Sequence, residues 1–303
     1  MRGDGERPAR VVSVGRNAAW IAFEDETVVR LAALRKNVER LTLVPGDLVF
    51  ATPLDEERVV IDRREPRSFA LERTTAGGRR RTMAANIDHV AIVAAFARPP
   101  LHLAMIDELL AFARIHDLAA TLLFTKSDLA EDERQVAVLP ELYRALGYEA
   151  LALNPKRGDG VAAVSALLAR RRTLLVGQSG VGKSSLFRAL GGEATVGDVS
   201  KIGRGKQTTT TGRLHRFPAG FLIDSPGVGE FELHGCSANQ IELGFVEFDA
   251  LAPRCRFNDC THRTEPGCAV RSAVEGGGVA ASRYASYLAI LARPENGRSG
   301  APN

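Results

Sequence analysis

The sequence of 303 residues lacks the long hydrophobic runs of a membrane protein. No apolar stretch reaches the ~18 residues of a membrane-spanning helix, and stretches such as 90–97 and 118–124 have the length of buried strands. The first ten residues are charged and polar, with no apolar segment behind them to form a secretory signal. Internal repeats are absent, and 45% hydrophobic with 25% charged residues exclude collagen-like and wholly disordered chains. We therefore expect a cytoplasmic protein that does not associate with membranes.

Lysine is scarce, since six of the 40 basic residues are lysines and the other 34 are arginines. The net charge of +4 mildly favours a polyanionic partner, and arginine suits bidentate contacts with phosphate groups. The codon bias of a GC-rich genome is an alternative explanation of the arginine excess and the one we favour. The composition therefore gives little weight to any particular partner.

Cysteine is absent before residue 236, and three of the four cysteines lie within fourteen residues around His262. In a cytosolic chain such a cluster indicates a metal site before a disulfide. Three thiolates and one imidazole are the ligands of a closed structural zinc site, so one zinc ion is expected at Cys255, Cys260, His262 and Cys268. Free thiols in a loop are the alternative. Cys236 lies outside the cluster and is expected to be an ordinary thiol.

The length predicts two or three domains at ~150 residues per domain. Residues 10–62 alternate short apolar runs with turns, which is typical of a small β-barrel, and 63–81 form a basic linker. From residue 86 onward buried strands alternate with helical stretches, as in a parallel sheet covered by helices on both faces, an α/β fold. The chain becomes irregular after residue 235. We expect domains at 1–68, 69–234 and 235–303, strands at 90–95, 120–124, 150–153, 174–176 and 221–223, and helices at 106–116, 139–146, 161–170, 185–190 and 284–291.

The strongest motif is a G-x-x-x-x-G-K-S phosphate loop directly after the apolar run 174–176. Its glycines let backbone N–H groups turn inward around phosphates, Lys183 reaches the β- and γ-phosphate oxygens, and Ser184 offers a hydroxyl to Mg²⁺. The predicted phosphate site comprises Gly177, Gln178, Ser179, Gly180, Val181, Gly182, Lys183, Ser184 and Ser185.

Two further segments are candidates for sensing the γ-phosphate. The D-x-x-G motif 224–227 follows the apolar run 221–223, roughly 45 residues after the phosphate loop. Its Asp224 can hold Mg²⁺ through water, and the Gly227 N–H can contact the γ-phosphate. Between these motifs, the glycine-bearing loop 203–211 ends in a threonine run. Thr209, or else Thr208, is expected to complete the Mg²⁺ shell; the alternative is a mobile loop with its hydroxyls in water.

The candidate base-reading motif follows the apolar run 121–124 and consists of Thr125, Lys126, Ser127 and Asp128. Asp128 can accept hydrogen bonds from both the N1–H and the amino group of guanine, and the Lys126 stem can cover the face of the base. Adenine lacks that pair of donors, so a buried and unpaired carboxylate would penalise ATP.

The order of these motifs is itself informative. In an ordinary GTPase the base-reading motif follows the phosphate loop, the threonine switch and D-x-x-G, whereas here it precedes all three. The cyclic order is preserved, which is what moving the chain termini around an intact sheet would produce. The segment that senses the γ-phosphate therefore runs directly into the cysteine-bearing region.

With 84–88 before the first sheet strand and the cysteine cluster after the last, this ordered set resembles the circularly permuted small-ribosomal-subunit-dependent GTPases of the RsgA (YjeQ) family. The resemblance covers nearly the whole chain. It implies an N-terminal OB-fold barrel, a permuted P-loop GTPase domain and a C-terminal zinc domain. It also implies GTP or GDP with Mg²⁺ and one structural zinc ion as ligands, and the small ribosomal subunit with its rRNA as the partner of a monomer.

The chain departs from the family pattern at several positions. Thr125 stands where the family often has asparagine, so an amide that braces the base site against the phosphate loop is lost and modest nucleotide affinity is expected. The expected base-capping motif is absent near 153–155, so those residues are left out of the site. Val228 cannot orient an attacking water. Gln207 stands where relatives commonly have histidine; it can position water but cannot act as a base, or it is merely a polar loop residue.

These features predict a slow GTP hydrolase, converting GTP to GDP and phosphate, with Lys183, Gln207, Thr209, Asp224 and Gly227 in catalytic roles and Ser184, Thr209 and Asp224 around Mg²⁺. The resemblance implies that it binds the small ribosomal subunit, is stimulated by it, and assists its late maturation. One alternative is an RNA-binding adaptor that uses GTP only as a switch. Another is a P-loop kinase or ATPase with a chance match to the base-reading motif.

Overall fold

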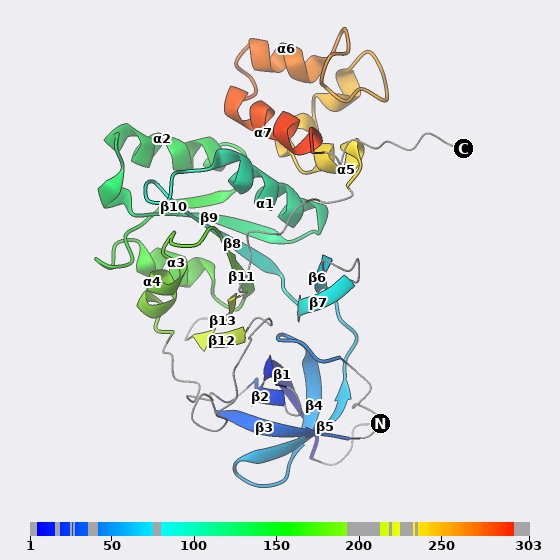
Figure 1. Cartoon of the computed structure of the whole chain (residues 1–303), viewed down its shortest axis with the longest axis vertical. Helices are drawn as coiled ribbons and strands as arrows, with labels where there is room; N and C mark the ends of the chain where they lie inside the picture. Colours follow the sequence, from blue (N-terminus) through cyan, green and yellow to red (C-terminus); the bar gives the residue numbers. More distant parts are fainter. Residues whose placement is uncertain are drawn as a thin grey trace. The chain divides into compact units, whose positions relative to one another are not determined.

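A computed structural model gives the structure of the chain, shown in Figure 1. It describes residues 5–15, 19–24, 26, 28–35, 42–74, 80–192, 213–217, 220–224, 233 and 236–293. The chain forms two compact units. The first is drawn from Met1–His89, Pro155–Val176 and Lys183–Val228, and the second from Val90–Asn154, Gly177–Gly182 and Gly229–Asn303.

The first unit begins with a closed five-stranded barrel in the order β1-β2-β3-β5-β4, which confirms the predicted small barrel. Neighbouring strands are antiparallel except for the parallel pair β3–β5. Alternating apolar side chains such as Val11, Ile21 and Ile61 fill its interior, because successive residues of a strand face opposite sides. The strands are β1 (Arg7–Val14), β2 (Ala19–Phe23), β3 (Val29–Leu34), β4 (Leu48–Pro53) and β5 (Arg58–Arg64).

The predicted linker 63–81 is not simply a loop. Residues Ala70–Thr74 (β6) pair antiparallel with Arg80–Ala85 (β7), with Ala70 opposite Ala85. The many arginines of this segment made it resemble a solvated linker, so its strands were not predicted. Inter-strand hydrogen bonds and the burial of Leu71 and Met83 stabilise the β6–β7 hairpin.

The larger sheet has the strand order β10-β9-β8-β11-β13-β12. Within the second unit β10 (Glu149–Ala152) is parallel to β9 (Ala119–Thr125), beside the fully buried β8 (His89–Ala95). Within the first unit β11 (Arg172–Val176) is parallel to β13 (Gly220–Asp224). The edge strand β12 (Arg213–Phe217) runs antiparallel to β13 and was not anticipated, because its polar residues conceal it.

Helices alternate with these strands as predicted, with shifted ends. They are α1 (Leu103–Ile115), a single 3₁₀ turn η1 (Ser127–Leu129), α2 (Glu133–Arg144), α3 (Val161–Leu167) and α4 (Lys183–Ala189). The largest shift is at α2, which begins six residues earlier than expected. Asp132 caps it there by accepting a hydrogen bond from the Arg134 N–H, a polar start that hydrophobic periodicity alone overlooks.

The region after residue 235 is more regular than expected. Ser237 and Gln240 form a capping box that starts α5 (Ala238–Leu243), and the turns η4 (Val246–Phe248) and η5 (Ala252–Arg254) follow. The helices α6 (Ala269–Glu275) and α7 (Ala281–Leu291) complete it. Helix α7 lies along α1 within the second unit (Figure 1), and Phe245, Phe248 and Tyr287 join Ala111 of α1 in one core. Among the described residues, none of the helices has both the length and the apolar character needed to cross a bilayer.

Candidate functional site

The phosphate loop follows β11 with a backbone that only glycine tolerates at its first position. Gly177 has φ of +140°, and a Cβ atom there would lie 2.1 Å from the carbonyl oxygen of Val93 in β8. Gly180 and Gly182 also have positive φ values, of +81° and +104°. Helix α4 then begins at Lys183, so the loop ends at a helix N-terminus. This glycine-lined turn fits the phosphate groups of a nucleotide.

The base-reading motif contacts the phosphate loop through Thr125, at the end of β9. Its side chain is 1% exposed, and its hydroxyl lies within hydrogen-bonding distance of the carbonyl oxygens of Val181 and, at 3.2 Å, Ala94. The brace expected to be lost with threonine in place of asparagine is therefore present in another form. Lys126 has a left-handed backbone, and its ammonium donates to the Arg98 carbonyl.

Asp128 has a partner that the sequence interpretation left out. The amide Nδ2 of Asn154, just after β10, donates to Asp128 Oδ1 at 2.8 Å, and Asn154 is 4% exposed. Because β9 and β10 are parallel, Thr125–Asp128 and Asn154 follow the same edge of the sheet. Asn154 directly follows a predicted strand, but no motif in the sequence marks it as part of the site.

Only some of the other residues predicted to bind the nucleotide lie in the part of the chain that the structure describes. Ser184 and Ser185 lie in the first turn of α4, next to Lys183. Asp224 is the last residue of β13, and only its backbone is described. The candidate switch and catalytic positions Gln207, Thr208, Thr209, Gly227 and Val228 lie outside the described residues.

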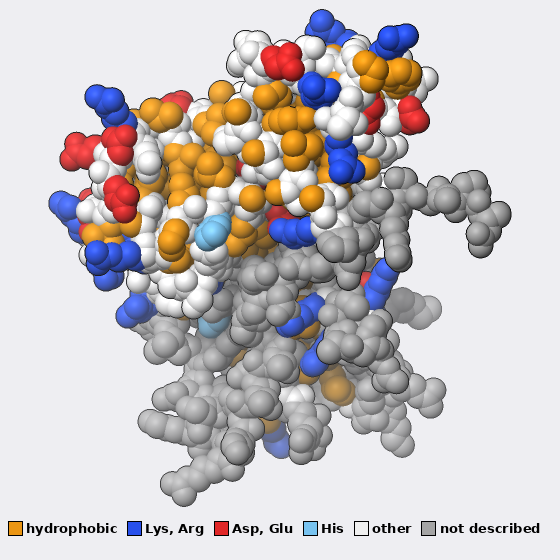
Figure 2. All heavy atoms as spheres, turned by 45° about the horizontal axis from the view of Figure 1, so that its top comes forward, with side chains coloured by type: hydrophobic (Ala, Val, Ile, Leu, Met, Phe, Trp, Pro, Cys, Tyr) orange, Lys and Arg blue, Asp and Glu red, His pale blue; other side chains and the backbone are white. Residues whose placement is uncertain are grey.

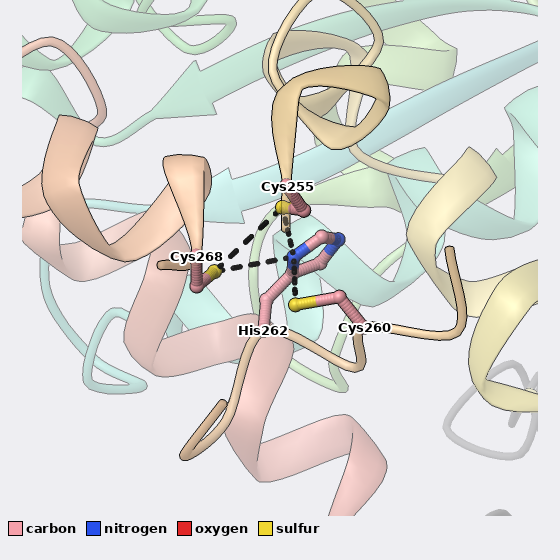
Figure 3. A group of neighbouring side chains, drawn as sticks. All are labelled: Cys255, Cys260, His262 and Cys268. Atoms are coloured by element: carbon pink, nitrogen blue, oxygen red, sulfur yellow. Dashed lines mark hydrogen bonds between the residues drawn. The ribbon is translucent and has the colours of Figure 1, made fainter. Parts of the chain in front are cut away.

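The four predicted metal ligands come together in the C-terminal region (Figure 3). Their ligand atoms all lie within 4.8 Å of one another. The Nδ1 atom of His262 is 3.5 Å from the sulfurs of Cys255 and Cys260 and 3.4 Å from that of Cys268. The sulfurs of Cys255 and Cys268 are 4.0 Å apart. A tetrahedral zinc ion with Zn–S bonds of ~2.3 Å and a Zn–N bond of ~2.0 Å needs ligand separations of ~3.5 to 3.8 Å. The three distances from Nδ1 match this range, and the 4.0 Å sulfur separation is only slightly wider, so the cluster fits zinc.

Surrounding groups hold this cluster in position. Glu242 at the end of α5 lies 3.1 Å from the Nε2 atom of His262, which leaves Nδ1 directed at the metal position. The N–H groups of Ala269 and Arg271, at the start of α6, lie 3.4 Å from the sulfurs of Cys255 and Cys268 and stabilise thiolates. Two tyrosines of α7 donate to the backbone around the histidine: Tyr284 to the His262 carbonyl and Tyr287 to that of Thr261.

Cys236 takes no part in the cluster. It is half-buried beside the apolar core of the second unit, and burial raises the pKa of its thiol. A raised pKa is the opposite of what an activated thiolate requires.

A phosphate loop joined to a base-reading motif in permuted order, behind a five-stranded barrel and before a Cys₃His centre, defines the class of circularly permuted GTPases with a zinc module. The family model described as RsgA GTPase matches residues 64–234. The chain belongs to the RsgA GTPase family and is a GTP-hydrolysing enzyme of that family.

Individual relatives agree with this assignment. The small ribosomal subunit biogenesis GTPase RsgA of Ectopseudomonas mendocina is 43% identical over 265 residues, which cover 86% of this chain and 76% of the relative. The crystal structure of YjeQ from Thermotoga maritima superposes with a TM-score of 0.77 at 30% identity, covering 95% of this chain and 99% of the other. YloQ, a circularly permuted GTPase, shares the fold with a TM-score of 0.77 at 23% identity, covering 99% and 100% of the two chains.

Proposed function

We propose that this GTPase acts in the biogenesis of the small ribosomal subunit, binding the subunit late in maturation and leaving it after slow GTP hydrolysis. The observation that carries the proposal is the 43% identity, over 86% of this chain, to a relative named for small ribosomal subunit biogenesis. Stimulation by the subunit is part of the proposal. Val228 cannot orient a water molecule, so the missing order has to come from the switch loop, from a partner, or from a loop that the partner orders.

In the proposed nucleotide site, Gly177–Ser185 surround the phosphates, with Lys183 on the β- and γ-phosphate oxygens. Thr125–Asp128 bind guanine, with Asp128 as the carboxylate that distinguishes it from adenine and Asn154 as the residue that orients Asp128. Ser184, Thr209 and Asp224 are the proposed Mg²⁺ ligands; the ion, when bound, neutralises charge on the phosphates. Gly227 and Gln207 are the proposed contacts of the γ-phosphate and of the attacking water.

We propose that residues 1–68 and 235–303 contact rRNA and that residues 69–234 bind the nucleotide. Near the zinc cluster, Phe257 is 40% exposed and the Arg256 guanidinium lies 5.5 Å from its ring centre, a pair suited to stacking on an unpaired base. Basic and acidic side chains are mixed over the part of the surface that is coloured in Figure 2, and no broad patch of one sign is visible in that part. Individual contacts of this kind therefore support rRNA binding better than overall charge does. We further propose that the protein is monomeric and cytoplasmic.

The first test measures GTP turnover by the purified protein alone, with small ribosomal subunits, and with large subunits as the control. We expect strong stimulation by small subunits only. Equal turnover in all three samples, with GTP still bound, would instead favour the adaptor that uses GTP only as a switch.

The second test exchanges the base specificity. In Asp128→Asn the side chain offers one acceptor and one donor, which matches xanthine better than guanine, so we expect GTP affinity to fall about 100-fold and XTP to bind better than GTP. Glu131→Gln, an exposed carboxylate three residues away, is the matched control. ATP competing equally with GTP for the unchanged protein would contradict the guanine assignment.

A further inference from the structure

A cavity of about 320 Å³ lies in the first unit, where barrel residues meet the edge of the sheet. Strand β12 packs against β1 in the same unit. The cavity is lined by four arginines, Arg10, Arg170, Arg172 and Arg216, together with Glu24 and Phe221 among others. None of its lining residues belongs to the phosphate loop, the base-reading motif or the cysteine cluster.

The carboxylates around this arginine cavity neutralise only part of its charge. Arg10 forms an ion pair with Glu24 at 2.9 Å, and Arg172 forms one with Asp88 at 2.7 Å. No described carboxylate forms an ion pair with Arg170 or Arg216. Two guanidinium groups thus contribute positive charge that no described acidic side chain offsets.

Two of the four arginines, Arg172 and Arg216, are held in position by backbone carbonyl groups. The Arg216 guanidinium donates to the carbonyl oxygens of Phe23 and Glu26 at the end of β2, which fixes it between sheet and barrel. Arg172 also donates to the Asn86 carbonyl at 2.6 Å. Preorganised guanidinium groups lose little side-chain entropy when they bind an oxyanion.

Arg10 is buried in the cavity wall, with only 7% of its surface exposed. Burial lowers the pKa of its guanidinium, and the neighbouring positive charge of Arg172 lowers that pKa further, against the opposing effect of Glu24. A buried cation beside other cations is costly unless an anion accompanies it. On one wall, the half-buried ring of Phe221 lies 5.6 Å from the Arg216 guanidinium and offers an apolar surface.

We propose that the arginine cavity binds a phosphoryl group, with Arg170 and Arg216 as its direct contacts and the attached sugar or base against Phe221. Arginine forks match the geometry of phosphate oxygens, and the volume admits more than a bare ion. The phosphoryl group belongs either to a small phosphorylated molecule or to the backbone of a single-stranded RNA. This site is distinct in its residues from the GTP site and does not depend on the proposed ribosomal role.

The test is calorimetric titration of the full-length, GDP-loaded protein with inorganic phosphate. We expect one phosphate site whose affinity falls at least tenfold in Arg170→Ala, a substitution at an exposed residue that leaves GTP turnover unchanged. Arg157→Ala removes an exposed arginine of the same unit and should retain phosphate binding. Lys183→Ala, titrated without nucleotide, should retain it as well, because the phosphate loop is not the site.

Unchanged phosphate affinity in Arg170→Ala, or loss of binding in Lys183→Ala but not in Arg170→Ala, would overturn the proposal. A second titration uses a short uridine oligonucleotide. Binding more than tenfold tighter than that of phosphate, with the same dependence on Arg170, identifies RNA as the source of the phosphoryl group. Binding no tighter than that of phosphate identifies a small phosphorylated molecule.

Discussion

At the scale of single residues, the pairing of Asp128 with Asn154 explains how a largely exposed loop presents a carboxylate in a defined orientation. Asn154 is buried at the edge of the sheet, and its amide donates to one oxygen of Asp128. A carboxylate can accept further hydrogen bonds after that one, so the pairing leaves capacity for the two donors of guanine. Asn154 therefore acts through Asp128 and is a positioning residue.

Asn154→Ala should weaken GTP binding about tenfold, because Asp128 then has to be ordered at the expense of binding energy. We expect the ratio of GTP to ATP affinity to fall while the affinity for inorganic pyrophosphate, which reports on the phosphate loop, stays the same. Fluorescence titration with labelled guanine and adenine nucleotides measures the ratio. An equal loss for both nucleotides and for pyrophosphate would mean that Asn154 only supports the fold.

His89 gives the protein a predictable response to acid. It is buried at the start of β8 with its Nδ1 atom 3.1 Å from the Thr173 hydroxyl, and burial lowers its pKa to about 3. In the unfolded chain the imidazole takes up a proton near its ordinary pKa of 6.5, while in the folded protein it stays neutral down to about 3. Stability is therefore lost as the pH falls through this interval, by about 2 kcal/mol at pH 5 relative to pH 7.

Denaturant unfolding at several pH values between 7 and 5 measures this slope. His89→Gln should flatten it by most of that amount even if the variant is less stable at pH 7. The exposed His102→Gln serves as control and should keep the wild-type slope. Parallel curves for all three proteins would mean that His89 is protonated in the folded state.

At the scale of elements, the sequence predicted those strands and sites whose residues lie close together in the chain. The buried run of β8, the strand before the phosphate loop and the cysteine cluster depend on residues close together in the chain, and all three were found. The hairpin β6–β7 and the edge strand β12 were missed because their polar residues pair across strands rather than facing a core. Asn154 was missed for a related reason, since its role comes from an adjacent strand and not from a motif.

The zinc module shows how an element outside the ligand set controls the ligands. Glu242 of α5 contacts the imidazole of His262 from the side opposite the sulfurs. Removing its charge makes the imidazole a weaker ligand and frees it to turn, so Glu242→Gln should lower zinc affinity about 10- to 100-fold.

Competition with a chromophoric zinc chelator measures that affinity. Glu275→Gln, at the exposed end of α6, is the matched control and should bind zinc like the unchanged protein. Cys260→Ser, which removes a ligand, should lose more affinity than Glu242→Gln. A Glu242→Gln protein with unchanged zinc affinity would show that the backbone around His262 alone orients the ring.

At the scale of the whole molecule, the second unit combines the base-reading residues with the entire zinc region. Helix α1 joins them: Asp107 accepts from Arg283 of α7 at 2.8 Å and from the Tyr143 hydroxyl of α2 at 2.9 Å. The next residue, Glu108, binds Arg293 after α7 and accepts from the N–H of Leu233 at 3.3 Å. Within this unit, the same face of α1 therefore holds Leu233, the zinc region and the helix α2 that follows the base-reading motif.

The ion pairs of Arg283 with Asp107 of α1 and with Glu247 form a joint between α1 and the zinc region. Arg283 lies at its centre and is completely buried. Its planar group also lies 4.5 Å from the ring centre of Phe245. Arg283→Met keeps much of the volume but leaves two buried carboxylates without their cation, which should lower the free energy of unfolding by about 3 to 5 kcal/mol. Arg254→Met, an exposed arginine of the same region, should change it by less than about 0.5 kcal/mol.

Denaturant unfolding measured by circular dichroism, together with zinc release followed by a chelator, distinguishes loss of the joint from general damage. If the joint couples the two parts, zinc release in Arg283→Met should precede the main unfolding transition, whereas the two coincide in the unchanged protein. The pair Arg283→Met with Glu247→Gln should recover part of the loss, because one of the two unpaired charges is then gone. Coincident transitions in Arg283→Met would mean that the apolar core around Tyr287 is enough to hold the zinc region to α1.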